Sequence, residues 1–351
     1  MVLSLPRRWR WKHRHRLLAA ALSCVVLVLY SFTLELPGVP RNWVQSPDPP
    51  PPPLTVLLWW EPFGKRRRMG DCQRLFNISG CRVITNRTAR ASAHAILFHH
   101  RDLGDASWLP RGARLPAQRW VWMNFESPSH SHWLGDVGGV FNWTMTYQAD
   151  SDVFVPYGRL LPRPQGGAAT VRLPRKRNLV AWVISNWNED HERVRYYRAL
   201  SRHVHVDVYG GAGRPLRAGG LLRTVSEYKF YLAFENSQHR DYITEKLWRN
   251  ALQAGAVPVV LGPSRANYER FLPRNAFIHV DDFSGPEKLA AYLRFLNRHG
   301  SLYRSYFAWK KRYTPHVTRF WDEHYCTVCQ ALRAAGNQQR TVTDLGPWYD
   351  S

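Results

Sequence analysis

The sequence of 351 residues is poor in cysteine and in acidic residues. Five cysteines are too few for a small domain that relies on disulfides for its fold. Only 26 Asp and Glu stand against 49 Lys and Arg, so the formal net charge is +23. The hydrophobic fraction of 44% excludes a mostly disordered chain and suits one large domain or two ordinary ones. Such a basic surplus is typical of chains that bind nucleic acid, anionic membranes, acidic glycans or phosphorylated small molecules.

Charged residues are absent from the run 17–34, which follows a flank of six basic residues within positions 1–16. As a helix, this run would span about 27 Å, close to the thickness of one hydrocarbon core. The basic flank predicts a cytosolic tail, so we interpret 17–34 as the signal anchor of a type II membrane protein. The alternative is a cleaved signal peptide, but the run is long for one and no small-residue cleavage site follows it.

Prolines dominate residues 35–53, including five in succession at 49–53, and predict an extended stem. Four continuous apolar runs then predict buried strands at 54–60, 93–100, 119–125 and 141–147. We expect residues 54–165 to form a first α/β lobe. Residues 166–178 are rich in Pro, Gly and basic side chains and predict an interdomain linker.

The last part of the chain, 179–351, alternates strand-like and helical patterns. The predicted strands are 179–185, 204–210, 229–236, 257–262 and 276–280, and the predicted helices are 190–203, 243–254 and 289–296. This alternation predicts a second α/β lobe with a parallel sheet, followed by a C-terminal extension. A cleft between two such lobes is the expected ligand site.

Three sequons follow the predicted anchor, at Asn77, Asn86 and Asn142. Together with the anchor they favour a lumenal chain that carries N-linked glycans. A lumenal chain also lies in an oxidising compartment, in which cysteines form disulfides.

The four cysteines beyond the anchor form two sequence-local pairs. Cys72 and Cys81 are nine residues apart, and Cys326 and Cys329 form a CxxC motif. We therefore expect disulfides Cys72–Cys81 and Cys326–Cys329. The alternatives for CxxC are zinc binding, which lacks a second ligand pair at suitable spacing, and a redox motif, which should open a helix after an early strand.

The segment 234–252 carries the densest set of chemically useful residues. A predicted strand ends at Glu235 and Asn236, and a helix is predicted to begin near residue 243. A helix N-terminus favours a phosphate group, and Lys246 adds a positive charge there. Tyr242, Glu245 and Lys246 have i, i+3, i+4 spacing, which places them on one helix face. The group predicts a nucleoside diphosphate site; the alternative is an ordinary amphipathic helix with an exposed Glu–Lys pair.

This segment, FENSQHRDYITEKLWRNAL, resembles the signature of the α-1,3-fucosyltransferases. Further blocks resemble the same family: WWEPFG (59–64), FHHRDL (98–103), WVWMNFESPSH (120–130), FNWT (141–144), DSDVFVPYGRL (150–160), YYRALS (196–201) and VPVVLGP (257–263). The similarity covers residues 54–351 and is strongest to the myeloid-type, Lewis x-forming branch. It implies a Golgi enzyme of GT-B type, with two Rossmann-like lobes facing a cleft, preceded by one transmembrane helix. The implied reaction moves L-fucose from GDP-β-L-fucose, with inversion, to the 3-hydroxyl of GlcNAc in N-acetyllactosamine on glycoproteins and glycolipids.

The resemblance also implies roles for single residues. Glu126 would be the general base, which fits a carboxylate at the end of a predicted strand. Arg193 and Lys246 would hold the pyrophosphate and offset its growing charge. The remaining donor contacts implied are Ser185, Asn186, Asn236 at the fucose, Tyr242 at the nucleotide and Glu245 at the ribose. Arg101, in HHRD (99–102), would restrict the enzyme to α-1,3 linkage.

A metal site has little support in the pattern. Asp150-Ser151-Asp152 is similar to the DxD of metal-dependent glycosyltransferases, but it precedes the predicted linker, whereas the nucleotide features follow it. We therefore expect a structural role for this triplet and no essential metal or cofactor. The neighbouring His pairs at 99–100 and 130–132 lack a partnering ligand set for zinc.

Two alternative functions stay open: a GT-B transferase that uses another sugar nucleotide, and a lumenal protein that binds polyanions. The second would not need Glu126 opposite Arg193 and Lys246. Nucleic acid is excluded as a partner because the predicted topology places the charge in the lumen. The sequence leaves open the preferred acceptor, the oligomeric state and which sequons are occupied.

Overall fold

The computed structural model describes residues 53–104, 108–112, 114–164, 173–336 and 340–351. The predicted tail, the predicted anchor and nearly all of the predicted stem lie outside the described residues. Within the described ranges, no helix combines the length and the apolar character that crossing a bilayer requires. The two main sheets belong to the same compact unit of the chain.

The first sheet has six strands, all paired in parallel, in the order β2-β1-β3-β4-β5-β6. Its strands are β1 (Leu54–Leu58), β2 (Cys81–Ile84), β3 (Ala95–His99), β4 (Arg119–Met123), β5 (Trp143–Thr146) and β6 (Val153–Phe154). The short helices along this part are η1 (Pro62–Gly64), α2 (Cys72–Phe76), η2 (Arg87–Ser92), η3 (His100–Asp102), η5 (Pro128–His130) and η6 (Leu134–Val137). The continuous apolar runs thus become buried strands of a parallel sheet, as predicted.

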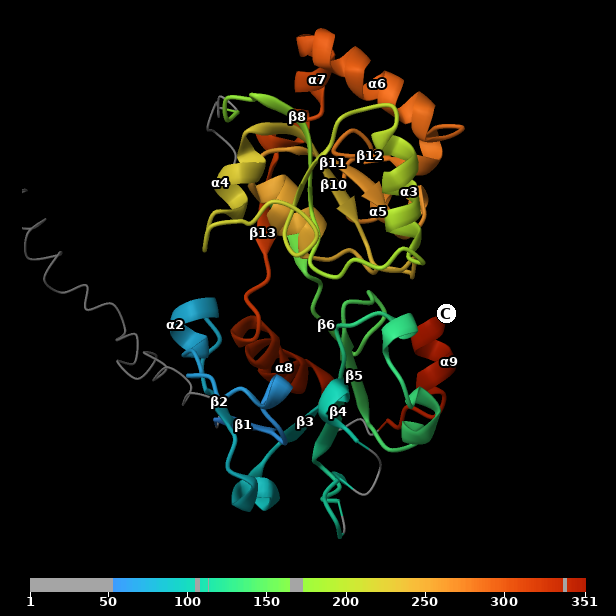
Figure 1. Cartoon of the computed structure of the whole chain (residues 1–351). Helices are drawn as coiled ribbons and strands as arrows, with labels where there is room; N and C mark the ends of the chain where they lie inside the picture. Colours follow the sequence, from blue (N-terminus) through green and yellow to red (C-terminus); the bar gives the residue numbers. More distant parts are fainter. Residues whose placement is uncertain (1–52, 105–107, 113, 165–172, 337–339) are drawn as a thin grey trace, which may run out of the picture. The chain divides into compact units, whose positions relative to one another are not determined.

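The second sheet has five parallel strands in the order β12-β11-β10-β8-β9. They are β8 (Asn178–Val183), β9 (Asp207–Tyr209), β10 (Tyr228–Phe234), β11 (Val257–Leu261) and β12 (Ile278–His279). Figure 1 labels β8, β10, β11 and β12 of this sheet. The helices between and after them are α3 (Glu192–Ser201), α4 (Leu221–Ser226), the π-helix η7 (Lys246–Gln253), α5 (Arg265–Glu269), η8 (Val280–Asp282), α6 (Pro286–Arg298), α7 (Gly300–Ser305) and η9 (Ala308–Lys311). The helices predicted at 190–203 and 289–296 are confirmed as α3 and α6.

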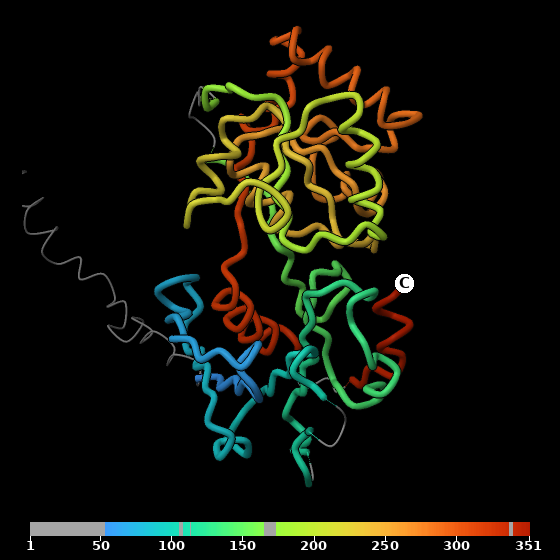
Figure 2. The backbone as a smooth tube through the Cα atoms, viewed as in Figure 1, coloured from blue at the N-terminus to red at the C-terminus, as the bar shows by residue number. Residues whose placement is uncertain are grey.

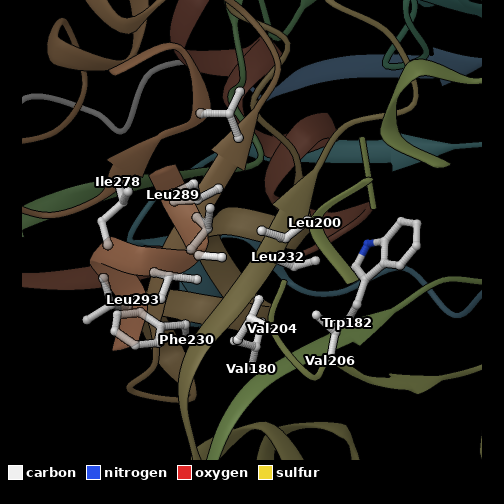
Figure 3. Close-up of a cluster of buried hydrophobic side chains, with 14 of the residues drawn as sticks. Val180, Trp182, Leu200, Val204, Val206, Phe230, Leu232, Ile278, Leu289 and Leu293 are labelled. Atoms are coloured by element: carbon white, nitrogen blue, oxygen red, sulfur yellow. The ribbon is translucent and has the colours of Figure 1, made fainter. Parts of the chain in front are cut away.

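Both faces of the second sheet carry apolar cores. On one face, alternate residues of β8 and β10 pack with α3 and α6; Figure 3 shows this cluster with Val180, Trp182, Leu200, Phe230, Leu232, Leu289 and Leu293 labelled. On the other face, Tyr231 and Ala233 pack with Leu247 and Trp248 of η7. Because successive strand residues point to opposite faces, both faces need apolar side chains, which explains the uninterrupted apolar run in β10.

The C-terminal part of the chain returns to the first sheet (Figure 2). After β13 (Tyr313–Val317), which pairs antiparallel with β7 (Gly158–Pro162), come α8 (Asp322–Ala335) and α9 (Leu345–Asp350). Tyr325 and Val328 of α8 share a buried cluster with Val56 and Val121 of the first sheet. We expected these helices to extend the second lobe; their apolar faces instead cover the first sheet.

The disulfides correct the expected pairing. Cys72 bonds to Cys326 and Cys81 to Cys329, with Cα–Cα distances of 5.5 and 5.9 Å. The predicted pairs Cys72–Cys81 and Cys326–Cys329 are wrong. Cys326 and Cys329 lie one turn apart on α8, where Cβ atoms are held about 5–6 Å apart, too far for a disulfide. Because Cys326 and Cys329 both form disulfides with cysteines near the N-terminal end of the described chain, the zinc and redox alternatives for CxxC are also contradicted.

The three sequons lie in unlike surroundings. Asn77 and Asn86 are exposed. Asn142 is only 8% exposed, and its Nδ2 donates to the carbonyl of Arg340 at 2.9 Å. Its Oδ1 accepts from the backbone N–H of Trp120 at 2.8 Å. A glycan on this Nδ2 would have to leave a nearly buried site and crowd the Arg340 carbonyl, so the folded structure opposes the expected glycosylation of Asn142.

Candidate active site

Glu126 lies three residues after the end of β4, at the edge of the first sheet where the carboxyl ends of the strands meet. Its Oε1 accepts hydrogen bonds from the Tyr242 hydroxyl at 2.7 Å, Asn236 Nδ2 at 3.3 Å and the Ser127 backbone N–H at 3.0 Å. The Tyr349 hydroxyl donates to the Glu126 carbonyl. Among the described residues, Oε2 has no hydrogen-bond partner, so one carboxylate oxygen is fixed and the other is free to accept a proton.

Tyr242 holds this carboxylate from a buried position. Burial, with the charges of Glu126 and Glu235, raises the pKa of Tyr242 well above its ordinary value, so the phenol stays a donor. The prediction that Tyr242, Glu245 and Lys246 share a helix face is wrong, because η7 begins at Lys246 and residues 242–244 are not helical.

The late helix start has two local causes. Asp241 has a left-handed backbone (φ +61°), and its buried carboxylate accepts from Asn267 Nδ2 at 2.6 Å, Arg270 Nη1 at 2.9 Å and the backbone N–H of Ala149 at 3.0 Å. Thr244 then binds the Glu235 carboxylate through its backbone N–H, at 2.8 Å. These contacts fix the turn that presents Tyr242 to Glu126.

Lys246 is the cation of a tightly packed group. Its Nζ donates to Glu235 Oε2 and to Thr244 Oγ1, both at 2.9 Å, and lies 3.7 Å from Glu245 Oε1. Burial opposes the charge on Lys246, but Glu235 and Glu245 outweigh burial and raise the pKa of Lys246. Burial raises the pKa of Glu235, and Lys246 offsets part of that shift. Glu235, at the end of β10, is a member of the site that the sequence analysis left without a role.

Arg193 lies in α3 and is 6% exposed. Its Nη2 donates to the Asn186 carbonyl at 2.7 Å, whereas its buried Nε has no hydrogen-bond partner within the part of the chain that is described. Burial lowers the pKa of Arg193, opposed by Glu235, Glu126 and Glu245, so these groups share one electrostatic neighbourhood. Buried polar donors are normally satisfied, and an unsatisfied guanidinium nitrogen here suits an anionic ligand.

Two further predicted donor contacts, Ser185 and Asn186, follow β8 and are exposed. The carbonyl of Asn186 is the acceptor for Arg193, so both residues lie beside the guanidinium. The structure thus brings Glu126, Asn236 and Tyr242 into direct contact and places Arg193 in the same electrostatic group.

Arg101 is not part of this group. It is exposed in η3, with its guanidinium carbon 5.6 Å from the ring centre of Phe63. Its neighbour Asp102 accepts from the Phe63 backbone N–H at 3.0 Å and contacts His99 Nδ1 at 2.6 Å. The predicted linkage residue therefore lies in the segment after β3, next to the strand that leads to Glu126.

The carboxylates of the DSD triplet are used within the fold. Asp152 accepts from the Thr144 backbone N–H at 2.8 Å and from Arg340 Nη1 at 2.6 Å. Asp150 accepts from Arg240 Nη2 at 3.0 Å. These contacts give both residues a structural role. In the described ranges, no three or more His, Cys, Asp or Glu side chains gather as a metal ion would need.

Comparisons with known proteins cover both halves of the chain. The family descriptions "Fucosyltransferase, N-terminal" and "Glycosyltransferase family 10 (fucosyltransferase) C-term" match residues 51–158 and 173–348. The human protein named alpha-(1,3)-fucosyltransferase 4 is 52% identical over 379 residues, 95% of this chain and 71% of that protein. The mouse 4-galactosyl-N-acetylglucosaminide 3-alpha-L-fucosyltransferase 9 is 46% identical over 293 residues, 83% of this chain and 80% of that protein.

Solved structures agree at the level of the fold. A crystal structure of an alpha1,3-fucosyltransferase with GDP-fucose has a TM-score of 0.54 at 17% identity, covering 84% of this chain and 94% of the other. This likeness supports the α/β fold with parallel sheets. The family resemblance found in the sequence blocks is thereby confirmed: the chain belongs to the fucosyltransferases of glycosyltransferase family 10.

Proposed function

We propose that the chain transfers L-fucose from GDP-β-L-fucose to the 3-hydroxyl of GlcNAc in N-acetyllactosamine, and so makes Lewis x-type glycans on glycoproteins and glycolipids. The observation that carries the proposal is Glu126, whose Oε1 is held by Tyr242 and Asn236 while Oε2 has no partner among the residues that the structure describes. The relatives named for this activity, and the solved relative with GDP-fucose, support the substrate pair.

The proposed reaction is a direct displacement at the anomeric carbon. Glu126 Oε2 takes the proton of the acceptor 3-hydroxyl as its oxygen bonds to C1 of fucose. The bond from C1 to the phosphate oxygen breaks on the opposite face, and GDP leaves with the electron pair, so the configuration inverts. Arg193 and Lys246 offset the charge that grows on the pyrophosphate. Within the donor site, Ser185 and Asn186 contact the donor, Asn236 lines the fucose pocket, and Glu245 binds the ribose.

Tyr242 takes a different part in this scheme from the nucleotide contact that the family resemblance implied. Its hydroxyl donates a hydrogen bond to the Glu126 carboxylate and so holds the base in place. Arg101 would favour α-1,3 over α-1,4 linkage from the segment after β3. The reaction needs no metal in this proposal, because Arg193 and Lys246 supply the positive charge at the leaving group.

The finer architecture belongs to the same proposal. The two parallel sheets support a GT-B arrangement of two Rossmann-like lobes that face a cleft and are joined by residues 166–178. The first lobe comprises 54–165 with the C-terminal helices α8 and α9, and the second comprises the second sheet and the other helices from residue 179 onward. Residues 1–16, 17–34 and 35–53 would be the cytosolic tail, the signal anchor and the stem of a Golgi type II protein. The two disulfides suit a lumenal compartment.

The test is transfer by the full-length chain in detergent. It would be incubated with N-acetyllactosamine and with GDP-fucose, UDP-galactose or CMP-sialic acid in separate reactions. We expect Lewis x trisaccharide with GDP-fucose alone, identified by linkage analysis. Transfer from another donor would instead support the alternative GT-B transferase. Tight heparin binding without any transfer would support the polyanion-binding alternative.

A further inference from the structure

The segment 237–241 follows β10 and lies between Asn236 and Tyr242, whose side chains hold Glu126 Oε1. The proposed reaction gives the side chains of this segment no part. Four of the five nevertheless contact the part of the chain that carries the first sheet: Ser237, His239, Arg240 and Asp241. This segment after β10 is therefore a contact surface for the part of the chain that holds the base.

Two of these contacts bind the loop that begins at Glu126. The Ser237 hydroxyl donates to Ser127 Oγ at 2.7 Å, and His239 Nε2 lies 2.6 Å from Ser129 Oγ, a hydrogen-bond distance. Ser127 is completely buried, so the packing around it opposes any independent shift. The loop is thus held at residues 127 and 129, directly after the base, and the position of its backbone depends on both contacts.

Arg240 anchors the same segment further along the first sheet. Its Nη2 donates to both carboxylate oxygens of Asp150, at 3.0 and 3.2 Å, in the turn between β5 and β6. Trp348 Nε1 of α9 donates to the same carboxylate at 3.2 Å, so two donors orient it. Next to Arg240, the Asp241 carboxylate accepts from the backbone N–H of Ala149 at 3.0 Å.

Both ends of the segment are fixed to the part of the chain that carries the second sheet. The backbone N–H of Glu235, just before it, donates to the Leu261 carbonyl of β11 at 2.8 Å. At its end, the Asp241 backbone N–H donates to Asn267 Oδ1 at 2.7 Å. The segment therefore holds the loop of the base in a defined position relative to Glu235, the partner of Lys246.

We propose that His239 and Arg240 are positioning residues for fucosyl transfer, which act on Glu126 through Ser129 and Asp150. The inference rests on the proposed function, since it takes Glu126 to be the base. A displacement of a reacting group by about 1 Å can cost about 100-fold in rate, so contacts of modest energy can control kcat. Neither side chain touches the donor in this scheme, so the affinity for GDP does not depend on them.

The first test exchanges the charges of the ion pair in the full-length chain. Arg240→Asp places two carboxylates opposite each other, so we expect kcat to fall about tenfold, while the Kd of GDP in titration calorimetry stays within about twofold. Asp150→Arg should cause a similar fall. The exchanged pair Arg240→Asp/Asp150→Arg restores opposite charges, and its kcat should return to within about threefold of the unaltered chain.

Arg214→Asp is the matched control for the charge reversal. Arg214 pairs with Asp207 of β9 at 2.9 Å, so both partners belong to the part of the chain that carries the second sheet. Reversal of this charge creates the same repulsion without loosening a contact to the first sheet. We expect its kcat to stay within about twofold of that of the unaltered chain.

The second test removes the contact of His239 with Ser129 from either side. His239→Ala and Ser129→Ala should each lower kcat about fivefold, again with GDP affinity within about twofold. Because both remove one contact, the double variant should lose no more than the larger single loss. Urea unfolding of every variant would identify any that fails to fold, and only folded variants enter the comparison.

The outcomes separate the inference from the proposed function. No recovery in the exchanged pair, or an equal fall in Arg214→Asp, would overturn the role of Arg240, and additive losses would overturn that of His239. Weaker GDP binding with unchanged kcat would assign the segment to the donor instead. Absence of fucose transfer to N-acetyllactosamine by the unaltered chain would overturn the proposed function, and the inference with it.

Discussion

The hydroxyl of Tyr242 donates a 2.7 Å hydrogen bond to Oε1 of Glu126, a residue 116 positions earlier in the chain. Glu126 follows the first sheet and Tyr242 follows β10 of the second, so this bond joins the two parts of the proposed site. It also assigns the Tyr242 hydroxyl to the catalytic base rather than to the nucleotide. This assignment predicts an effect of Tyr242 on kcat rather than on GDP affinity.

We predict that Tyr242→Phe lowers kcat about tenfold, because the Glu126 carboxylate loses a donor that fixes its orientation, and leaves the Kd of GDP within about twofold. Titration calorimetry with GDP and steady-state rates would check both numbers. Glu126→Gln is the companion variant, with an expected fall in kcat of about 100-fold or more and intact GDP binding. Loss of GDP affinity in Tyr242→Phe with unchanged kcat would return Tyr242 to the nucleotide.

Lys246 is best tested together with Glu235, because Lys246 neutralises the fully buried carboxylate of Glu235. Lys246→Ala alone would leave Glu235 buried and unpaired, which costs about 3–5 kcal/mol of stability. We predict that Lys246→Ala/Glu235→Gln recovers most of this loss in urea unfolding. The double variant should still bind GDP at least about tenfold more weakly, since the phosphate loses its cation. Normal GDP affinity in a folded double variant would remove Lys246 from the donor site.

The sequence could locate those site residues whose position depends on a single strand or helix. The strands were predictable because each buried strand needs an unbroken apolar run. Glu126 directly follows one of these runs, 119–125, which contains β4. Lys246 was located through its place at the start of a predicted helix, and Arg193 through the family resemblance. Their partners were not predictable, because contacts such as Lys246 with Glu235 depend on how a turn folds.

Two errors and one unforeseen burial have the same origin. The helix of Lys246 begins late because Thr244 binds Glu235, the disulfides join distant residues because α8 returns to the first sheet, and Asn142 is buried by Arg340 and Trp120. Spacing along the chain carries no signal for such tertiary contacts. A local pattern therefore predicted the element but not its partner.

Stability should depend on pH through His100. This residue is 7% exposed, and its Nδ1 accepts from Trp122 Nε1 at 3.1 Å. Burial lowers the pKa of His100 from 6.5 to about 4. Between these two values the unfolded chain binds a proton that the folded chain does not, so the free energy of unfolding falls as pH falls from 6.5 towards 4.

We predict that His100→Gln flattens this pH dependence by at most about 3 kcal/mol, the size of the shift. Urea unfolding at pH 7.5 and 4.5 would measure it for both chains. A uniform loss of stability at both pH values, with the slope unchanged, would show only that the Trp122 contact matters and would refute the titration.

Asn142 provides a test of sequon use. Because its amide is bonded to Arg340 and Trp120, we predict that Asn142→Gln leaves the glycosylated mass of the chain expressed in mammalian cells unchanged and lowers its free energy of unfolding by about 1–3 kcal/mol. Asn77→Gln and Asn86→Gln alter exposed side chains and serve as controls, with little expected loss of stability. A drop of one glycan mass in Asn142→Gln would contradict the folded-state contacts.

Pairs of alanine variants distinguish the disulfide pairing in the structure from pairing between cysteines close in the sequence. If Cys81 bonds to Cys329, as in the structure, Cys81→Ala/Cys329→Ala removes one disulfide and costs about 2–5 kcal/mol of stability. Cys72→Ala/Cys81→Ala then removes both disulfides and costs more, because α8 loses every covalent link to the N-terminal part. Under local pairing the order is reversed, since Cys72→Ala/Cys81→Ala would remove only one.

Urea unfolding of the two variants gives the order, and a digest without reductant gives the partners directly. We expect peptides that join Cys72 to Cys326 and Cys81 to Cys329. Their separations of 254 and 248 residues mean that each bond closes nearly the whole described chain, so reduction should release α8 from the first sheet before the second sheet unfolds. A peptide joining Cys326 to Cys329, or a lower stability for Cys81→Ala/Cys329→Ala than for Cys72→Ala/Cys81→Ala, would contradict this pairing.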